Sequence, residues 1–201
     1  MSKNVPFHTE KTTDFNLSVI NVKPLNLSVE EKGILEDFSN KKISYVVFDS
    51  DVDDWSVGSR NFFDKVHLNS NLCFVIEDET NCKFGGVMFD KITVDNSWTS
   101  SQSAFIFSLL RNGKLNPKKF RIRDSKGFCY DEWDRPEEGA FVLYSDKGDM
   151  LFGFGGGYDI GVAKKGVDKS KCKSCTFVAG EKDLTNRPEF RVKRIMVYKL
   201  E

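Results

Sequence analysis

The sequence has few histidines, no long apolar run and no excess of charge of either sign. Its two histidines are His8 and His67. Because His8 lies in a polar start of the chain, any Ser-His or Cys-His catalytic arrangement would have to use His67. A single histidine that follows a helical stretch is more often packed against its neighbours than catalytic. We therefore assign no catalytic residue and expect a protein that is not an enzyme.

The absence of long apolar runs and the odd number of cysteines indicate in which cellular compartment the protein is expected. No stretch approaches the roughly 20 consecutive apolar residues of a membrane span, and the polar start lacks the apolar segment of a signal peptide. Five cysteines argue against a disulfide framework and favour reduced thiols. We expect a cytoplasmic or nuclear protein without membrane insertion. The cysteines are Cys73, Cys82, Cys129, Cys172 and Cys175.

The formal charge of zero conceals an uneven distribution. Residues 1–100 carry 10 Lys and Arg against 16 Asp and Glu, whereas residues 101–201 carry 20 against 14. Two basic segments, 114–123 and 164–173, resemble the cation clusters that bind a phosphate backbone. A solvated basic face is the ordinary alternative, and a pI near 6.7 is low for a dedicated nucleic-acid binder. The candidate polyanion or DNA contacts are Lys114, Lys118, Lys119, Arg121, Arg123, Lys164, Lys165, Lys169, Lys171 and Lys173.

Cys172 and Cys175 form a CxxC pair, the best redox candidate in the chain. The neighbouring Lys173 would lower the pKa of a thiol and favour the reactive thiolate. No second CxxC or paired histidine follows, so a zinc ribbon is not expected. Two interpretations remain open: a redox-sensitive pair that could act as a thiol antioxidant, or two partly buried thiols in a loop.

An acidic cluster occupies residues 49–54. Asp49, Asp51 and Asp53 alternate as the first ligands of a calcium loop do, but the sixth position is Asp54 and the twelfth is Arg60. An EF-hand requires Gly and Glu there, so we expect no metal site. The cluster instead predicts a solvated acidic turn that caps a helix starting near residue 56.

Glycines beside aromatic residues give the main architectural signal. Such glycines usually allow a close backbone approach or a positive φ within a sheet. The run 153–157 does not continue as a dinucleotide fingerprint, because Tyr158 stands where glycine or alanine is needed. Gly161 and Gly166 have P-loop spacing without the required Lys and Ser or Thr. We therefore expect no cofactor and assign a structural role to Gly85, Gly86, Gly153, Gly155, Gly156 and Gly157.

The hydrophobic pattern predicts an α+β fold. Residues 1–14 are polar and unpatterned and are expected to be a flexible arm, with a single domain over 15–201. A capping box at 28–31 begins a helix that ends near residue 40. A second, shorter helix follows from residue 55, and then many short strands indicate two antiparallel sheets packed as a sandwich with flanking helices. The clearest expected strands are 43–48, 72–76, 84–89, 104–110 and 190–200.

Several segments, taken in order over residues 42–200, resemble the TLDc domain of the oxidation-resistance proteins. The resemblance rests on an opening strand that ends at Ser50, a helix that ends at His67, Phe-Gly-Gly at 84–86, Ser-Trp at 97–98, a Phe-Ser-Leu strand at 104–109, Phe-Gly-Gly-Gly at 154–157, Thr-Phe at 176–177 and the last strand at 194–198. Leu68 replaces a common glycine, and Tyr198 replaces a common tryptophan.

The resemblance implies a sandwich of two antiparallel sheets, in agreement with the pattern of the residues. It also implies a non-enzymatic binding or regulatory module of the oxidative-stress response, with the vacuolar proton-pumping ATPase as a protein partner in several relatives. The family offers no established catalytic residues to transfer. A DNA-binding regulator of stress-responsive transcription that uses the two basic segments is the alternative hypothesis.

Overall fold

A computed structural model describes residues 24–124, 135–145 and 148–201. The expected arm at residues 1–14 lies outside these residues. Within them, no helix is long and apolar enough to cross a membrane. The elements are α1 (Val29–Ser39), β1 (Ile43–Asp49), α2 (Asn61–Val66), β2 (Leu72–Asp78), β3 (Lys83–Met88), β4 (Trp98–Thr99), β5 (Phe105–Arg111), β6 (Lys114–Arg121), the 3-10 helix η1 (Pro136–Gly139), β7 (Phe141–Leu143), β8 (Met150–Phe154), β9 (Ile160–Ala163) and β10 (Val192–Leu200).

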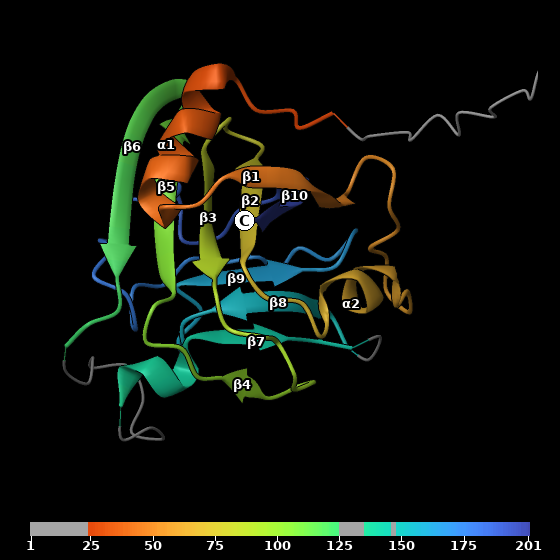
Figure 1. Ribbon diagram of the computed structural model, residues 1–201. Coiled ribbons are helices and arrows are strands. Elements are labelled where there is room, and N and C mark those ends of the chain that lie inside the picture. Colours follow the sequence, from red (N-terminus) through yellow and green to blue (C-terminus); the bar gives the residue numbers. More distant parts are fainter. Residues whose placement is uncertain (1–23, 125–134, 146–147) are drawn as a thin grey trace, which may run out of the picture.

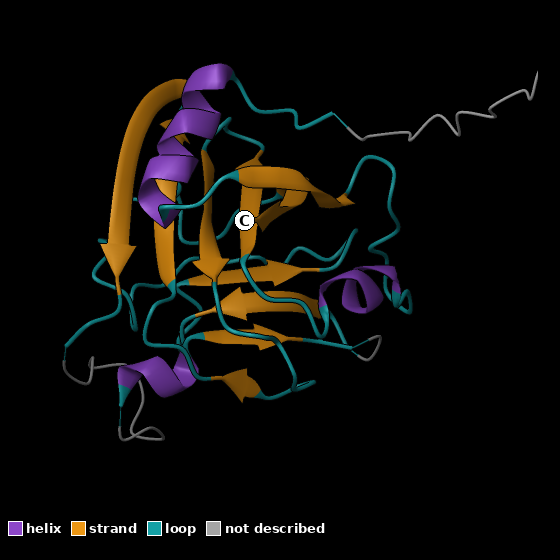
Figure 2. Ribbon diagram, in the orientation of Figure 1, coloured by secondary structure: helices purple, strands orange, loops and turns teal. Residues whose placement is uncertain are grey.

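Two antiparallel sheets form a sandwich, as the sequence predicted (Figures 1 and 2). The larger sheet has the order β1-β10-β2-β3-β5-β6, and the smaller has the order β4-β7-β8-β9. The C-terminal strand β10 therefore lies between β1 and β2, in the interior of the larger sheet. The fold closes only when the last residues of the chain join its first strand.

Aromatic rings fill the space between the sheets. The Phe74 ring of β2 lies 5.1 Å from those of Phe141 and Phe152 and 5.5 Å from that of Phe154, measured between centroids. All four side chains are fully buried. Such ring pairs add about 0.5–1.5 kcal/mol each beyond the area that they bury. These contacts join residues far apart in sequence, so they hold the two sheets together.

Gly86 of β3 allows this close packing between the sheets, whereas its neighbour Gly85 allows a close approach to β2 within the larger sheet. A Cβ atom on Gly86 would lie 2.7 Å from the Phe154 ring, and one on Gly85 would lie 1.8 Å from the Phe74 carbonyl oxygen. On β8, a Cβ on Gly153 would meet the Tyr158 ring at 2.8 Å. Gly155 has a different role, because its φ of +77° is one that L side chains rarely adopt.

Helix α1 covers the outer face of the larger sheet (Figure 2). The predicted capping box is present: Ser28 Oγ accepts from the Glu31 N–H at 3.0 Å, and Glu31 Oε2 accepts from the Ser28 N–H at 2.8 Å. Glu31 also pairs with Lys83 of β3 at 2.5 Å, and Leu35 is buried against the sheet. The helix is therefore fixed both by its own cap and by the sheet beneath it.

One expected boundary is wrong. The second helix begins at Asn61, not near residue 56, and no side chain caps it. Asp54 instead accepts a hydrogen bond from the Ser56 N–H at 3.0 Å within the preceding loop. Local rules favour carboxylates before a helix, but Asp54 caps a turn of the loop and does not cap the helix.

Replacing Gly86 by alanine tests the contact between the sheets. The new methyl group would press on the buried Phe154 ring, so we expect the free energy of unfolding to fall by about 1–3 kcal/mol. Urea unfolding measures this change. Gly33→Ala in α1 is the control: no atom lies within 4 Å of the new methyl group, and it should raise stability by about 0.5–1 kcal/mol. Equal effects at both positions would contradict the packing described.

Candidate functional site

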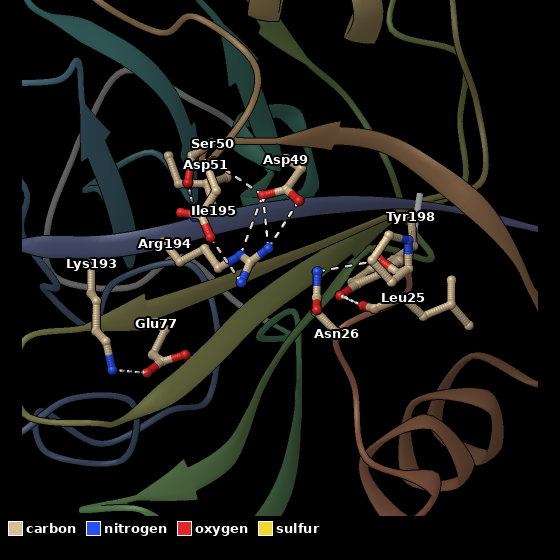
Figure 3. A network of polar contacts seen from close by, with 11 residues as sticks. Leu25, Asn26, Asp49, Ser50, Asp51, Glu77, Lys193, Arg194, Ile195 and Tyr198 are labelled. Carbon is tan, nitrogen blue, oxygen red and sulfur yellow. Dashed lines mark hydrogen bonds and ion pairs between the residues drawn. The ribbon is translucent and has the colours of Figure 1, made fainter. Parts of the chain in front are cut away.

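The acidic turn after β1 is anchored by an arginine of the last strand (Figure 3). Arg194 donates to both carboxylate oxygens of Asp49, at 2.9 and 3.1 Å, and pairs with Asp51 at 2.9 Å. Asp49 is buried, so this ion pair is shielded from solvent. The Ile195 N–H donates to Ser50 Oγ at 2.9 Å. The end of β1 and the start of the turn are therefore fixed to β10.

The remainder of the loop between β1 and α2 is fixed as well. Asp53 accepts from the Asp49 N–H at 2.9 Å and pairs with Lys65 of α2 at 2.7 Å. Two valines of this anchored loop are exposed to solvent, Val52 at 68% and Val57 at 55%. The loop thus presents apolar side chains on a backbone that is held in place.

Three carboxylates of the acidic turn, those of Asp49, Asp51 and Asp53, are paired with cations of the chain, whereas a solvated turn was expected. Among residues 24–124, 135–145 and 148–201, no three His, Cys, Asp or Glu side chains come together to hold a metal ion. His67 lies at the end of α2, where its ring stacks on Phe63 with centroids 4.7 Å apart. Its Nε2 atom lies 3.4 Å from the Thr93 carbonyl oxygen.

Leu68 has a backbone conformation that disfavours leucine. Its φ is +62°, and its side chain is 55% exposed. Its N–H donates to the Ile92 carbonyl at 2.8 Å, which holds the residue in this conformation. The positive φ explains why the TLDc sequences that this chain resembles commonly have glycine at this position. In Leu68 the same φ strains the backbone of a residue with an exposed apolar side chain.

Asp159 anchors the segment that contains the CxxC pair. Its carboxylate accepts from the N–H groups of Cys175, Thr176 and Phe177 at 2.8 to 2.9 Å. Burial raises the pKa of Asp159 to about 6, although the three N–H donors favour the ionised form. Sequence reasoning did not identify this residue. Its signal was an aspartate directly before the apolar strand 160–163.

The two cysteines of the CxxC pair are buried, each with 7% of its surface exposed. Burial raises the pKa of the Cys172 thiol well above its ordinary value, and the carboxylates of Asp159 and Asp78 raise it further. The expected lowering of the pKa by Lys173 is therefore wrong for Cys172. Cys172 has the character of a packed thiol and not that of a reactive thiolate.

The first basic segment forms β6, at one edge of the larger sheet, and contains Pro117. Lys118 pairs with Asp183 at 2.7 Å. Lys119 donates to the Phe38 carbonyl at 2.6 Å and lies 4.2 Å from the centroid of the Phe105 ring. Lys114 is exposed.

Arg121, the last residue of β6, pairs with Asp124, and Arg123 donates to the Cys175 carbonyl at 2.9 Å. Arg123 also donates to Ser174 Oγ at 3.1 Å. Most cations of the first basic segment are thus already engaged within the chain.

The lysines of the second basic segment are exposed to solvent, except for Lys164. Lys164 is 1% exposed, and its ammonium donates to the Ser145 carbonyl at 3.0 Å, so it is not a surface cation. Lys169 pairs with Asp149, and Lys171 lies 4.7 Å from the centroid of the Tyr158 ring. Lys165 and Lys173 are exposed.

The two basic segments come together only in part. Arg123 of the first reaches Ser174, directly after the second. The backbone of Lys165, however, forms an isolated β-bridge with Ser56 in the loop before α2. The first segment lies instead in β6, the edge strand beside β5 in the larger sheet. The structure therefore does not gather all ten cations into one continuous basic face.

The family model of the TLDc domain matches residues 23–201, nearly the whole chain. No curated protein matches the sequence.

Replacing Leu68 by glycine tests the strain at this position. Glycine adopts a positive φ without penalty, so we expect the free energy of unfolding to stay unchanged or rise by up to about 1 kcal/mol. Leu115→Gly is the matched control, because Leu115 is also exposed, at 41%, but lies in β6 without a positive φ. That variant should lose about 0.5–1 kcal/mol. Urea midpoints that fall equally for both variants would rule out strain at Leu68.

Replacing Asp159 by asparagine tests the buried carboxylate. With its pKa raised to about 6, the folded protein holds this proton more tightly than the unfolded chain between about pH 4 and pH 6. The contribution of Asp159 to stability therefore falls as the pH rises through this window, by up to about 3 kcal/mol. Urea unfolding should show a difference between native protein and variant that shrinks from pH 4 to pH 6.

Asp183→Asn provides a control of opposite sign. The hydrogen bond from Lys118 lowers the pKa of Asp183, so its contribution to stability is lost as the pH falls. The difference between native protein and this variant should grow as the pH rises from acid values. If the two variants follow the same pH trend, the account of Asp159 is wrong.

Proposed function

The chain belongs to the TLDc domain family, and from this premise we propose that it is a non-enzymatic binding module of the oxidative-stress response. In this proposal the two sheets form a stable scaffold, and the loops between strands carry the contacts to a partner. Family membership supports the module as a whole. The loop between β1 and α2 suggests where a partner binds.

The observation that carries the proposal is the exposure of Val52 and Val57 on an anchored loop. Exposed apolar side chains that are grouped in one segment mark protein contact sites more often than isolated ones do. The ion pairs of Asp49 with Arg194 and of Asp53 with Lys65 fix the loop before a partner arrives. Binding then costs little conformational entropy, because the contact segment is already ordered.

The proposed partner is a protein surface, and the family resemblance makes the vacuolar proton-pumping ATPase the first candidate. The exposed carboxylates of Asp51 and Asp54 flank Val52. A complementary partner surface would have an apolar centre with basic residues around it. This arrangement fits a regulatory contact better than it fits chemistry at the loop.

Binding of DNA is the alternative function. The exposed Lys114 of β6 supports it, whereas the partners of Lys118, Lys119, Arg123 and Lys164 within the chain weigh against it. A thiol antioxidant would need a reactive sulfur, and the raised pKa of Cys172 weighs against that role. We therefore place protein binding first.

Replacing both Val52 and Val57 by serine tests the proposed contact. Burial of a valine contributes about 1.5–3 kcal/mol, so loss of both should weaken binding to the purified vacuolar proton-pumping ATPase by at least about tenfold. Biolayer interferometry measures this change, and urea unfolding should show native stability. Val29→Ser is the matched control, because Val29 is 92% exposed and lies on α1, far along the chain from the loop.

Three results would count against the proposal in different ways. Equal binding by the double variant would remove the loop as the contact. Failure of the native protein to bind the ATPase would remove that partner. A complex with DNA that weakens steeply as salt is added, and on replacement of Lys114 and Lys118, would favour the alternative.

A further inference from the structure

Two adjoining hollows open beside the start of β10. The first, the charged chamber, has a volume of about 430 Å³, and the second, the Trp55 chamber, has a volume of about 150 Å³. Both are lined by Asp168, Ser170 and Arg191, so they share one wall. Together they have the size of a site for a small molecule. Neither chamber includes Val52 or Val57, although Trp55 of the second chamber belongs to the same loop.

A tryptophan with an unpartnered indole nitrogen lines the Trp55 chamber. Trp55 is 7% exposed, and its indole Nε1 is buried without an acceptor among the described residues. Buried polar groups are nearly always hydrogen-bonded, so an unpaired one requires an explanation. The remaining wall is mixed, with the apolar Val167 and Val192 beside the buried Lys164. Because Trp55 lines the chamber, its indole ring would report a ligand that binds there.

The wall between the chambers carries an ion pair that is easily exchanged. Arg191 and Asp168 lie 2.8 Å apart, with side chains 72% and 68% exposed. Exposed pairs of this kind contribute little to stability. The Arg191 backbone is fixed separately, because its N–H donates to Glu79 Oε2 at 2.6 Å. The side chains can therefore separate without moving the strand.

The charged chamber presents both signs of charge. Its guanidinium groups come from Arg187 and Arg191, and its carboxylates come from Glu79, Asp168 and Glu189. Arg187 makes no ion pair with any described residue. A ligand with charge of only one sign would pair with the groups of opposite charge in the chamber. It would also lie beside groups of its own charge, which would repel it.

We propose that this cleft binds a small zwitterion with a carboxylate and an ammonium group, such as a free amino acid. The ligand enters between Arg191 and Asp168. Its carboxylate pairs with Arg191, and its ammonium pairs with Asp168. Each charge of the broken ion pair gains a new partner.

The fluorescence of Trp55 provides a direct test. The chain has three tryptophans, at positions 55, 98 and 133, so Trp98→Phe together with Trp133→Phe leaves Trp55 as the only reporter. The probes are glycine, L-alanine, L-valine and L-glutamine. L-valine is compared with 3-methylbutanoate, which lacks the ammonium, and with isobutylamine, which lacks the carboxylate. Calorimetry of the unsubstituted chain with the same probes gives an independent measurement.

Charge variants identify the groups that bind the ligand. Arg191→Gln and Asp168→Asn should each weaken binding of L-valine by about tenfold or more, because one ligand charge then lacks its partner. Both side chains are largely exposed, so these variants should unfold at nearly the native urea concentration. Arg135→Gln is the matched control, because Arg135 is exposed and does not line the cleft.

The proposal predicts saturable binding of an amino acid, with both single-charge analogues at least about tenfold weaker. It is overturned if no amino acid changes the fluorescence or heat in a saturable way. It is also overturned if 3-methylbutanoate or isobutylamine binds as tightly as L-valine. Equal binding by native protein and by both cleft variants would likewise reject the site.

Discussion

The close approach of β3 to β8 is the constraint on which the rest of the structure depends. Gly86 has no side chain, so the Phe154 ring can lie against the β3 backbone and reach Phe74 and Phe141 in the same layer. Interiors of proteins are packed as densely as organic crystals, so one methyl group at this point would displace several rings. Both sheets owe their spacing to this contact.

Buried charge then fixes the loops that the sandwich leaves open. Asp49 binds Arg194 across the edge of the larger sheet, and Asp159 holds the backbone that follows Ser174 beside the smaller one. In each case a carboxylate inside the molecule is paired with several donors, which makes removal of one partner costly. The core determines the layers, and these carboxylates determine the shape of the surface around them.

The features with local causes were predictable from the sequence. The capping box of Ser28 and Glu31 needs only neighbouring residues, and the glycines beside phenylalanines correctly indicated a close contact within a sheet. The sequence could not show that Phe154 is the ring over Gly86, because that choice depends on how the two sheets align. For the same reason it predicted the layers of the fold better than the partners of individual side chains.

The surface was harder to predict for the same physical reason. Many lysines and arginines of the sequence could pair with Asp49. Only the arrangement of the strands selects Arg194, which is 145 positions away. Lys164 belongs to a run of lysines, so composition favoured exposure, yet its ammonium reaches the Ser145 carbonyl inside the protein. The unpartnered indole of Trp55 depends entirely on tertiary packing and leaves no trace in the sequence pattern.

The two edge strands of the larger sheet, β1 and β6, affect whether molecules associate through their sheets in solution. Unpaired strand edges recruit strands from other molecules, and bulges, prolines and lysines oppose this. β1 has irregular pairing at two places, and β6 contains Pro117 with lysines on either side. Pro117 and the lysines of β6 therefore disfavour the addition of a strand from a neighbouring molecule, whether or not these cations bind a ligand.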